Sequence, residues 1–194
     1  MSKIDALKKL RQETGVSFAE CQKALEATGG DPEKAREFLR QRGQKIAELK
    51  SARTAAQGIV AAYVHSNKKV GVLLDLRCES DFVARSPEFS QLAHEITLQI
   101  AAMNPKYAKA DEIPAELIAE EKRLCEEQLA DSGKPQNIIS QIVEGRLSKY
   151  RETVCLLSQQ WIKDEGKTMQ DFINEHIAII GENIVVGNFI RYEI

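Results

Sequence analysis

The stretch from residue 59 to residue 103 constrains the fold of this chain more than any other part of its sequence. Residues 59–65 and 70–78 are two runs rich in β-branched and aliphatic side chains, and the polar residues 66–69 separate them. Two such runs with a short polar break between them are typical of an antiparallel β-hairpin. We therefore expect a hairpin near the centre of the chain.

A helix is predicted soon after the hairpin. Ser86 suits the N-cap and Pro87 the first helical position, because the N–H that proline lacks would have no helical partner there. Apolar residues then follow at helical spacing, namely Phe89, Leu92, Ile96, Ile100 and Met103.

Asp81 and Phe82 lie between strand and helix, at a rim where rigid scaffolds display functional side chains. Local sequence alone favours Asp81 as a turn residue and Phe82 as a core residue.

Residues 1–43 are predicted to form a module of three short helices with a small core. Ser17 opens a capping box at the start of the second helix, and Gly29-Gly30 ends that helix. Asp31-Pro32 starts the third helix, which we expect to end at Gly43.

A charged helical linker is expected at residues 44–57, followed by a larger domain at residues 58–194. Two amphipathic helices interrupted at residues 132–135 predict a helical hairpin in this domain. The apolar run at residues 184–192 reads as a strand that pairs with the central hairpin. The sequence thus predicts an α+β fold: a three-helix module, a helical linker, and a three-stranded antiparallel sheet backed by helices with a helical hairpin.

The charges of the chain nearly cancel, since 27 Lys and Arg oppose 29 Asp and Glu for a net charge of −2. A general nucleic-acid binder would be strongly basic, so we expect no direct nucleic-acid partner. No apolar run reaches the roughly 18 residues that a membrane span requires, and residues 1–5 lack the apolar segment of a signal peptide. Together with four scattered cysteines, which fit reduced thiols, these features predict a cytoplasmic protein without a membrane partner.

The residue patterns of enzymes are weak or missing in this sequence. It has no glycine-rich phosphate loop, and no two cysteines have the spacing of a metal chelate, so we expect no metal site. Cys78 with His65 could form a nucleophile and its base. However, Cys78 ends an apolar strand, where a cysteine is usually an inert small hydrophobe. A thiol enzyme stays one alternative function, although the position of Cys78 argues against it.

The residues after the second strand, Cys78-Glu79-Ser80-Asp81-Phe82-Val83-Ala84-Arg85, closely resemble the signature of the bacterial elongation factor Ts family. That family usually has Thr-Asp-Phe-Val-Ala here, and Ser80 keeps the hydroxyl group. Further blocks that resemble the family follow its order along essentially the whole chain, at residues 10–11, 14–15, 21–26, 30–35, 133–135, 144–150, 156–159 and 180–184.

The resemblance implies a guanine-nucleotide exchange factor for the GTPase elongation factor Tu, which is not an enzyme in the bond-making sense and needs no cofactor. In the family, the N-terminal module resembles a ubiquitin-associated (UBA) domain and docks on the GTPase. An Asp-Phe tip wedges between GTPase helices near the magnesium ion. Carried over to this chain, Asp81 and Phe82 are the wedge, flanked by Ser80 and Val83. The expected contact residues of the module are Leu10, Arg11 and Val16.

The resemblance also bears on assembly. Many family members carry a duplicated core, whereas this chain holds a single core unit. Short members pair two core units by dimerisation, which implies a homodimer that binds two GTPase molecules in a 2:2 complex. Gly187-Asn188 stands where the family commonly has two basic residues, so the contacts of those basic residues are not carried over. A protein-binding module without exchange activity is the second alternative function.

Overall fold

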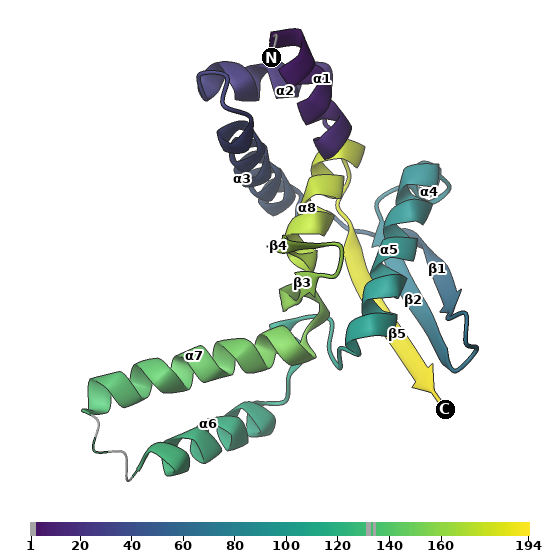
Figure 1. Ribbon diagram of the computed structural model, residues 1–194. Helices are drawn as coiled ribbons and strands as arrows, with labels where there is room; N and C mark the ends of the chain where they lie inside the picture. Colours follow the sequence, from purple (N-terminus) through teal and green to yellow (C-terminus); the bar gives the residue numbers. More distant parts are fainter. Residues whose placement is uncertain (1–2, 131–132, 134) are drawn as a thin grey trace. The chain divides into compact units, whose positions relative to one another are not determined.

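A computed structural model describes residues 3–130, 133 and 135–194 of the chain (Figure 1). Its helices are α1 (Lys3–Thr14), α2 (Phe18–Ala27), α3 (Pro32–Lys50), α4 (Asp81–Ala84), α5 (Pro87–Met103), α6 (Ala115–Leu129), α7 (Gln136–Val154) and α8 (Met169–Ile180), with 3-10 turns at Ala110–Glu112 and Leu156–Ser158. Its strands are β1 (Gln57–Val64), β2 (Val70–Cys78), β3 (Gln160–Trp161), β4 (Asp164–Thr168) and β5 (Val185–Glu193). Residues 132 and 134 of the predicted break between α6 and α7 lie outside the described residues, as does residue 131 just before it.

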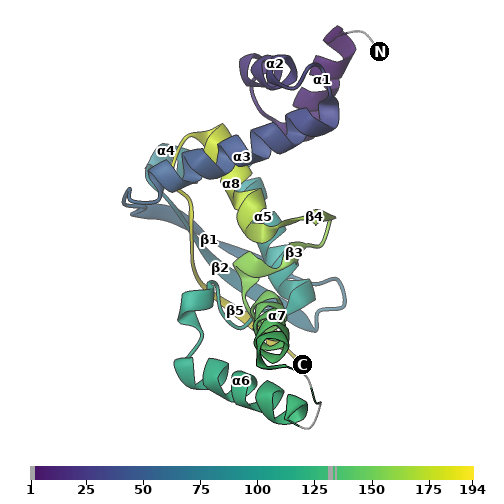
Figure 2. The same ribbon diagram turned by 90° about the vertical axis from the view of Figure 1, so that its left-hand side faces the viewer.

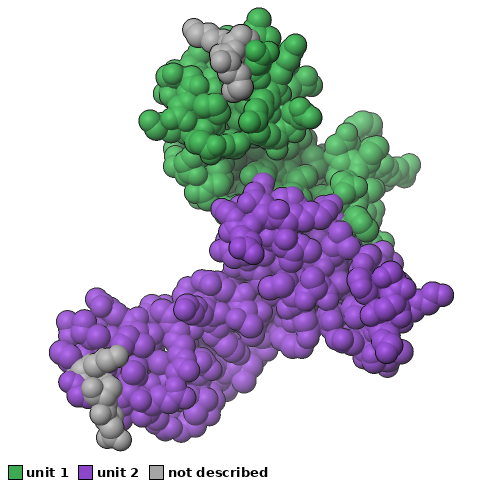
Figure 3. Space-filling model, in the orientation of Figure 1, with its two compact units in different colours: residues 1–61, 75–94, 170–186 green, residues 62–74, 95–169, 187–194 purple. Residues whose placement is uncertain are grey.

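The chain divides into two compact units, which Figure 3 colours separately. Unit 1 comprises residues 1–61, 75–94 and 170–186, and unit 2 comprises residues 62–74, 95–169 and 187–194. Their segments alternate along the sequence because β1, β2, α5 and β5 each contribute residues to both units. The predicted division into a module, a linker and a larger domain consists of continuous segments of sequence, and it stays a prediction.

The predicted three-stranded antiparallel sheet is confirmed, with the strand order β1-β2-β5. The N–H of His65 donates to the carbonyl of Val70 at 2.9 Å and closes the β1–β2 hairpin. Burial alternates along all three strands, as expected for a sheet that has one covered face. Within unit 2, Arg191 of β5 donates through Nε to the carbonyl of Ala101 in α5 at 3.0 Å, so this helix lies against the sheet.

Helices α1, α2 and α3 form the predicted three-helix module in unit 1. Their buried core consists of Leu10, Cys21, Ala24, Ala35 and Leu39. The predicted helix starts are confirmed: Ser17 Oγ accepts the N–H of Glu20 at 3.4 Å, and Asp31 Oδ1 accepts that of Glu33 at 3.0 Å. Side-chain acceptors at these positions satisfy N–H groups that have no partner inside the helix.

The predicted end of the third helix at Gly43 is wrong, because α3 continues to Lys50. Gly43 is buried against α8, where an added Cβ would lie only 3.7 Å from the carbonyl oxygen of Asn174. The missing side chain therefore permits close packing of α3 on α8, which lie side by side in Figures 1 and 2. Gln44 donates to Asp171 of α8 at 2.7 Å. Within the range expected for the linker, residues 44–50 form the end of α3 and residues 51–56 have no helical structure.

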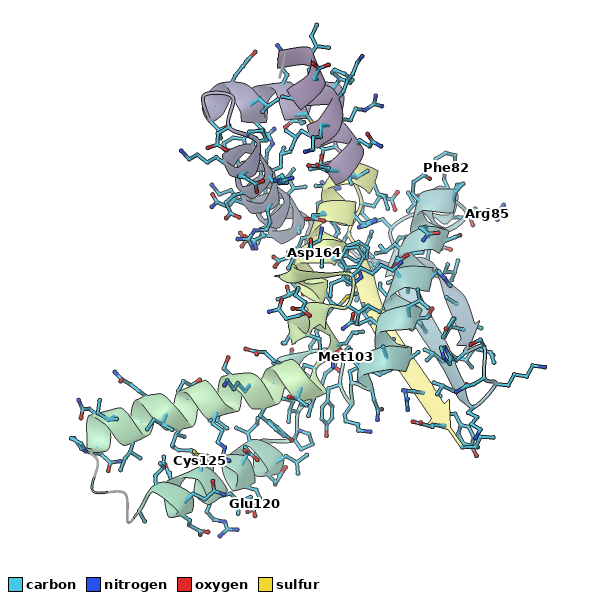
Figure 4. All side chains as sticks on the ribbon, in the orientation of Figure 1. Phe82, Arg85, Met103, Glu120, Cys125 and Asp164 are labelled. Atoms are coloured by element: carbon cyan, nitrogen blue, oxygen red, sulfur yellow. The ribbon has the colours of Figure 1, made fainter. Side chains whose placement is uncertain are left out.

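Helices α6 and α7 form the predicted helical hairpin in unit 2 and lie side by side in Figures 1 and 2. Cys125, Val143 and Leu147 are the buried residues between them, and Figure 4 labels Cys125 at this contact. A row of apolar side chains on each helix thus accounts for the pairing.

A second small hairpin, β3–β4, was not predicted. Its position depends on Gln99 of α5, which is fully buried in unit 2. The side chain of Gln99 donates to the carbonyl of Gln160 at 3.0 Å and accepts the N–H of Ile162 at 2.9 Å. A buried amide that is paired on both sides in this way fixes the loop against the helix. Among the described residues, no helix is long and apolar enough to cross a membrane.

Candidate functional site

The short helix α4 presents an aromatic side chain to solvent directly after strand β2. Ser80 is its N-cap, and the Ser80 hydroxyl oxygen accepts the N–H of Val83 at 3.3 Å. Val83 and Ala84 are buried, whereas Phe82 is 86% exposed. Figure 4 shows Phe82 at the outer end of this segment. The local expectation that Phe82 is a core residue is therefore wrong, because its neighbours occupy the inward side of the helical turn.

Asp81 is also exposed, and its carboxylate pairs with Arg85 one turn later at 2.9 Å. The side chains of Asp81 and Arg85 remain 60% and 78% exposed. An ion pair this open to water contributes little, because solvent screens it and both side chains lose rotamer freedom. The Asp81 carboxylate is therefore available to a partner that offers a better polar contact.

The four predicted tip residues have different surroundings. Phe82 and Asp81 present their side chains, whereas Ser80 uses its hydroxyl group within the chain and Val83 is 8% exposed. The Val83 side chain packs inward beneath the tip, and its part in a partner contact stays a prediction. Glu182 contacts the same turn although 102 residues separate it from Ser80. Sequence reasoning missed this contact, because Glu182 lies in a block that resembles the family but no local pattern links it to the turn at Ser80.

The thiol proposed as a nucleophile is deeply buried. Cys78 has no exposed surface, and its thiol donates to the carbonyl of Ser80 at 3.2 Å. Burial, followed by the nearby charge of Glu182, raises the pKa of the Cys78 thiol. Since the thiolate is the nucleophile, these surroundings disfavour thiol catalysis. The ring of His65, the proposed base, contacts the Tyr63 hydroxyl at 2.8 Å. No group of three metal-ligating side chains gathers anywhere in the described ranges.

The predicted contact residues of the N-terminal module are only partly accessible. Leu10 is 1% exposed and lies in the core of the three helices, and its part in a partner contact stays a prediction. Val16 is partly buried against the same core. Arg11 is exposed and stacks over the ring of Phe18, 5.2 Å from its centroid.

Phe18 was missed as a surface residue. Phe18, Cys21 and Leu25 follow one another at i, i+3 and i+7, the spacing of an inward helix face, yet Phe18 is 42% exposed. The stacked guanidinium explains the difference, since an aromatic face can be covered by a cation instead of by the core. Arg11, Val16 and Phe18 therefore lie near the junction of α1 and α2.

Comparison with known proteins gives matches over nearly the whole chain. The sequence profile of the family described as Elongation factor TS matches residues 5–194. A protein named Elongation factor Ts from Thermotoga petrophila is 51% identical over 191 residues, which cover 98% of this chain and 95% of that protein. Proteins of the same name from Coprothermobacter proteolyticus and Thermoanaerobacter sp. (strain X514) are 48% and 44% identical, and the matches cover 96% and 100% of this chain and 94% and 95% of those proteins.

Proposed function

We propose that this chain, which belongs to the elongation factor Ts family of translation elongation factors, is a guanine-nucleotide exchange factor for elongation factor Tu. The observation that carries the proposal is the 86% exposure of Phe82 on a turn whose next two residues are buried. An aromatic side chain this exposed has a large apolar surface that only a partner can cover. Asp81 adds an accessible carboxylate beside it.

Such a tip would promote exchange by binding one packing of the GTPase helices more tightly than the packing of the GDP-bound form. GDP is held in a GTPase by phosphate contacts and by a magnesium ion. A ring that fills a gap between two GTPase helices stabilises a shifted packing, because packed cores switch between arrangements instead of stretching. The coupling is reciprocal, so the factor weakens GDP binding by the same ratio by which GDP weakens binding of the factor.

The free energy of burying one aromatic side chain is large enough for Phe82 to make a major contribution to GDP release. Burying one Phe side chain is worth roughly 1.5–3 kcal/mol. Each tenfold change in affinity corresponds to about 1.4 kcal/mol. Phe82 alone therefore accounts for one to two orders of magnitude in GDP release. In this mechanism Asp81 exchanges its weak pair with Arg85 for polar groups that support the magnesium ion.

We further infer that the N-terminal module docks on the same GTPase. Arg11 and Phe18 form an exposed, stacked pair on it, and Val16 lies near them. Leu10 acts from inside, since its burial fixes the end of α1 that carries Arg11. A cation over an aromatic ring combines apolar area with a charge, a combination common at the centres of interfaces.

A homodimer is proposed from the sheet. In unit 2, the open sheet face carries four exposed apolar side chains: Val64, Leu73, Ile190 and Tyr192. An apolar surface on the uncovered side of a sheet is typical of an interaction site. A second copy of the chain would cover it with the same surface, as two-fold symmetry requires. Each copy would then bind one GTPase molecule.

The deciding experiment measures release of labelled GDP from elongation factor Tu with and without this protein. Exchange activity predicts that saturating protein accelerates release at least about tenfold, the lower value expected for one buried aromatic. If the two proteins form a complex but GDP release does not change, the chain is a binding module without exchange activity. If alkylation of the cysteines in the folded protein abolishes an activity toward another substrate, the thiol alternative gains support.

A further inference from the structure

Glu182 follows helix α8 and binds the turn that carries the tip. Within unit 1, its Oε2 accepts the backbone N–H groups of Glu79 at 3.0 Å and Ser80 at 2.9 Å. Its Oε1 accepts the hydroxyl proton of Ser80 at 2.6 Å. One carboxylate thus satisfies three donors on two consecutive residues, immediately before the first residue of α4.

The contact to the Ser80 hydroxyl also determines how α4 is capped. A serine hydroxyl has one proton and two lone pairs. Because the proton is donated to Glu182, a lone pair remains directed at the N–H of Val83, which it accepts at 3.3 Å. Hydrogen bonds to a carboxylate are short and strong, and chains of such bonds reinforce one another. Glu182 therefore selects the hydroxyl orientation that caps the helix.

A second contact runs in the opposite direction, from the Glu79 side chain to the backbone after α8. The backbone N–H of Asn183 donates to the Glu79 carboxylate at 2.6 Å. The buried side-chain amide of Asn183 donates to the carbonyl of Arg53 at 2.8 Å. The segment after α8 and the segment after β2 are therefore bound to each other through both backbones, and Glu182 is the residue that reaches the turn itself.

We propose that Glu182 is a positioning residue for nucleotide exchange, which holds the turn at Glu79 and Ser80 so that Phe82 and Asp81 project in a fixed direction. This inference rests on the proposed exchange function. A tip that is ordered before binding loses little conformational freedom in the complex, so more of the contact energy of Phe82 acts on the GTPase. Glu182 would act through the tip, without touching the nucleotide.

The first test is a double-mutant cycle on the maximal rate of GDP release from elongation factor Tu. We expect Glu182→Ala to lower this rate about tenfold when Phe82 is present, and by less than about twofold in a Phe82→Ala background, because a residue that acts only through the tip has no effect once the tip is lost. Glu182→Gln should recover most of the rate, since its amide can still accept the two N–H groups and donate to the Ser80 oxygen. The matched control is Glu48→Gln, an exposed glutamate of α3, which should leave the rate unchanged.

The second test needs no GTPase. Hydrogen exchange of the Glu79, Ser80 and Val83 amides should be slow in the unmodified protein and faster in Glu182→Ala, while the amides of α1 to α3 stay as they are. If Glu182→Ala does not fold, Glu182→Asp replaces it: the charge is kept, but the carboxylate is one methylene too short to reach all three donors. The same direction of change is expected.

Two results would overturn the proposal. One is unchanged exchange at the Glu79 and Ser80 amides when Glu182 is replaced. The other is an equal loss of GDP release with and without Phe82, which indicates a general loss of structure. If the unmodified protein releases no GDP, the proposed exchange function fails instead, and the amide measurements still decide whether Glu182 positions the turn.

Discussion

Phe82 and Val83 are adjacent apolar residues with opposite surroundings, and this contrast defines the candidate site at the scale of residues. Val83 is 8% exposed and Phe82 is 86% exposed, although local sequence favours a core position for an aromatic residue. The difference arises because α4 is a single turn with only one inward side. A side chain on its outer side is displayed at no cost to the core.

Replacement of Phe82 by alanine tests directly whether the exposed ring promotes GDP release. The variant should slow GDP release from elongation factor Tu at least about tenfold, because the apolar surface that fills the partner is gone. Its thermal unfolding midpoint should match that of the unmodified protein, since the exposed ring contributes little to the core. Leu49→Ala, a change at another exposed apolar residue, is the control. A folded Phe82→Ala protein with normal exchange activity would refute the role assigned to the tip.

The buried cysteines give a pH-dependent prediction. Burial raises the pKa of the Cys78 thiol and of the Cys155 thiol, so the folded protein keeps these protons to higher pH than the unfolded chain does. The stabilisation is complete below the ordinary thiol pKa of about 8.5 and is lost as the pH rises above it. Urea unfolding at about pH 7.5 and about pH 9.5 should show a lower midpoint at the higher pH.

Cys78→Ala provides the control for that measurement, because it removes one of the two shifted thiols. The fall in stability between the two pH values should be smaller in this variant than in the unmodified protein. An identical fall in both proteins would show that other groups cause it.

At the scale of elements, the β1–β2 hairpin depends on one close approach between backbones. Gly58 of β1 lies so near β2 that an added Cβ would be 2.8 Å from Cα of Arg77, closer than real Cβ contacts. Gly71 of β2, near the turn of the hairpin, has open space instead, with no atom within 4 Å of an added Cβ. The two glycines of one hairpin are therefore required to different degrees.

Gly58→Ala should destabilise the protein by about 2 kcal/mol or more, because backbone atoms have to move to admit the methyl group. Gly71→Ala is the matched substitution and should be neutral or slightly stabilising, since alanine restricts the unfolded chain without a clash. Denaturant unfolding of both variants measures the difference. Equal stability of the two variants would mean that β1 and β2 can separate at Gly58 without loss.

At the scale of the whole molecule, the open sheet face has exposed apolar side chains on neighbouring strands, and none of the described residues of unit 2 covers them. Leu73 lies on the central strand, β2, and Ile190 on the edge strand, β5. A lone sheet of this size exposes both an apolar face and unpaired edges, which natural proteins cover by association. The proposed homodimer supplies that cover.

Leu73→Glu should convert the protein from a dimer to a monomer, because two-fold symmetry brings each introduced carboxylate near the apolar surface of the other copy. Light scattering over a range of protein concentrations measures the mass. Leu49→Glu places the same charge on an exposed residue of α3 and should leave the dimer intact. If the unmodified protein has the mass of one chain at all concentrations, the homodimer is excluded.

Several elements could be predicted because their signals are local. The caps at Ser17 and Asp31 bind N–H groups two or three residues away. The hairpin needs only two apolar runs and a polar turn between them, and α6 and α7 need only a repeated apolar row. The position of Asp81 and Phe82 between a strand and a helix followed from the same patterns, whereas their proposed role at a partner came from the family resemblance.

The tertiary structure alone decided what depends on distant segments. In the sequence, Gly43 indicates a helix end, but in the structure it lies within α3 and lets α8 pack closely against that helix. In the sequence, Gln99 is only a polar residue in an apolar helix; its hydrogen-bond partner, the carbonyl of Gln160, is supplied by a distant loop. Glu182 acquires its partners from a turn 102 residues away. Hydrogen-bond caps and apolar periods depend on adjacent residues, whereas burial and long-range pairing depend on which remote part of the chain comes to lie next to a side chain.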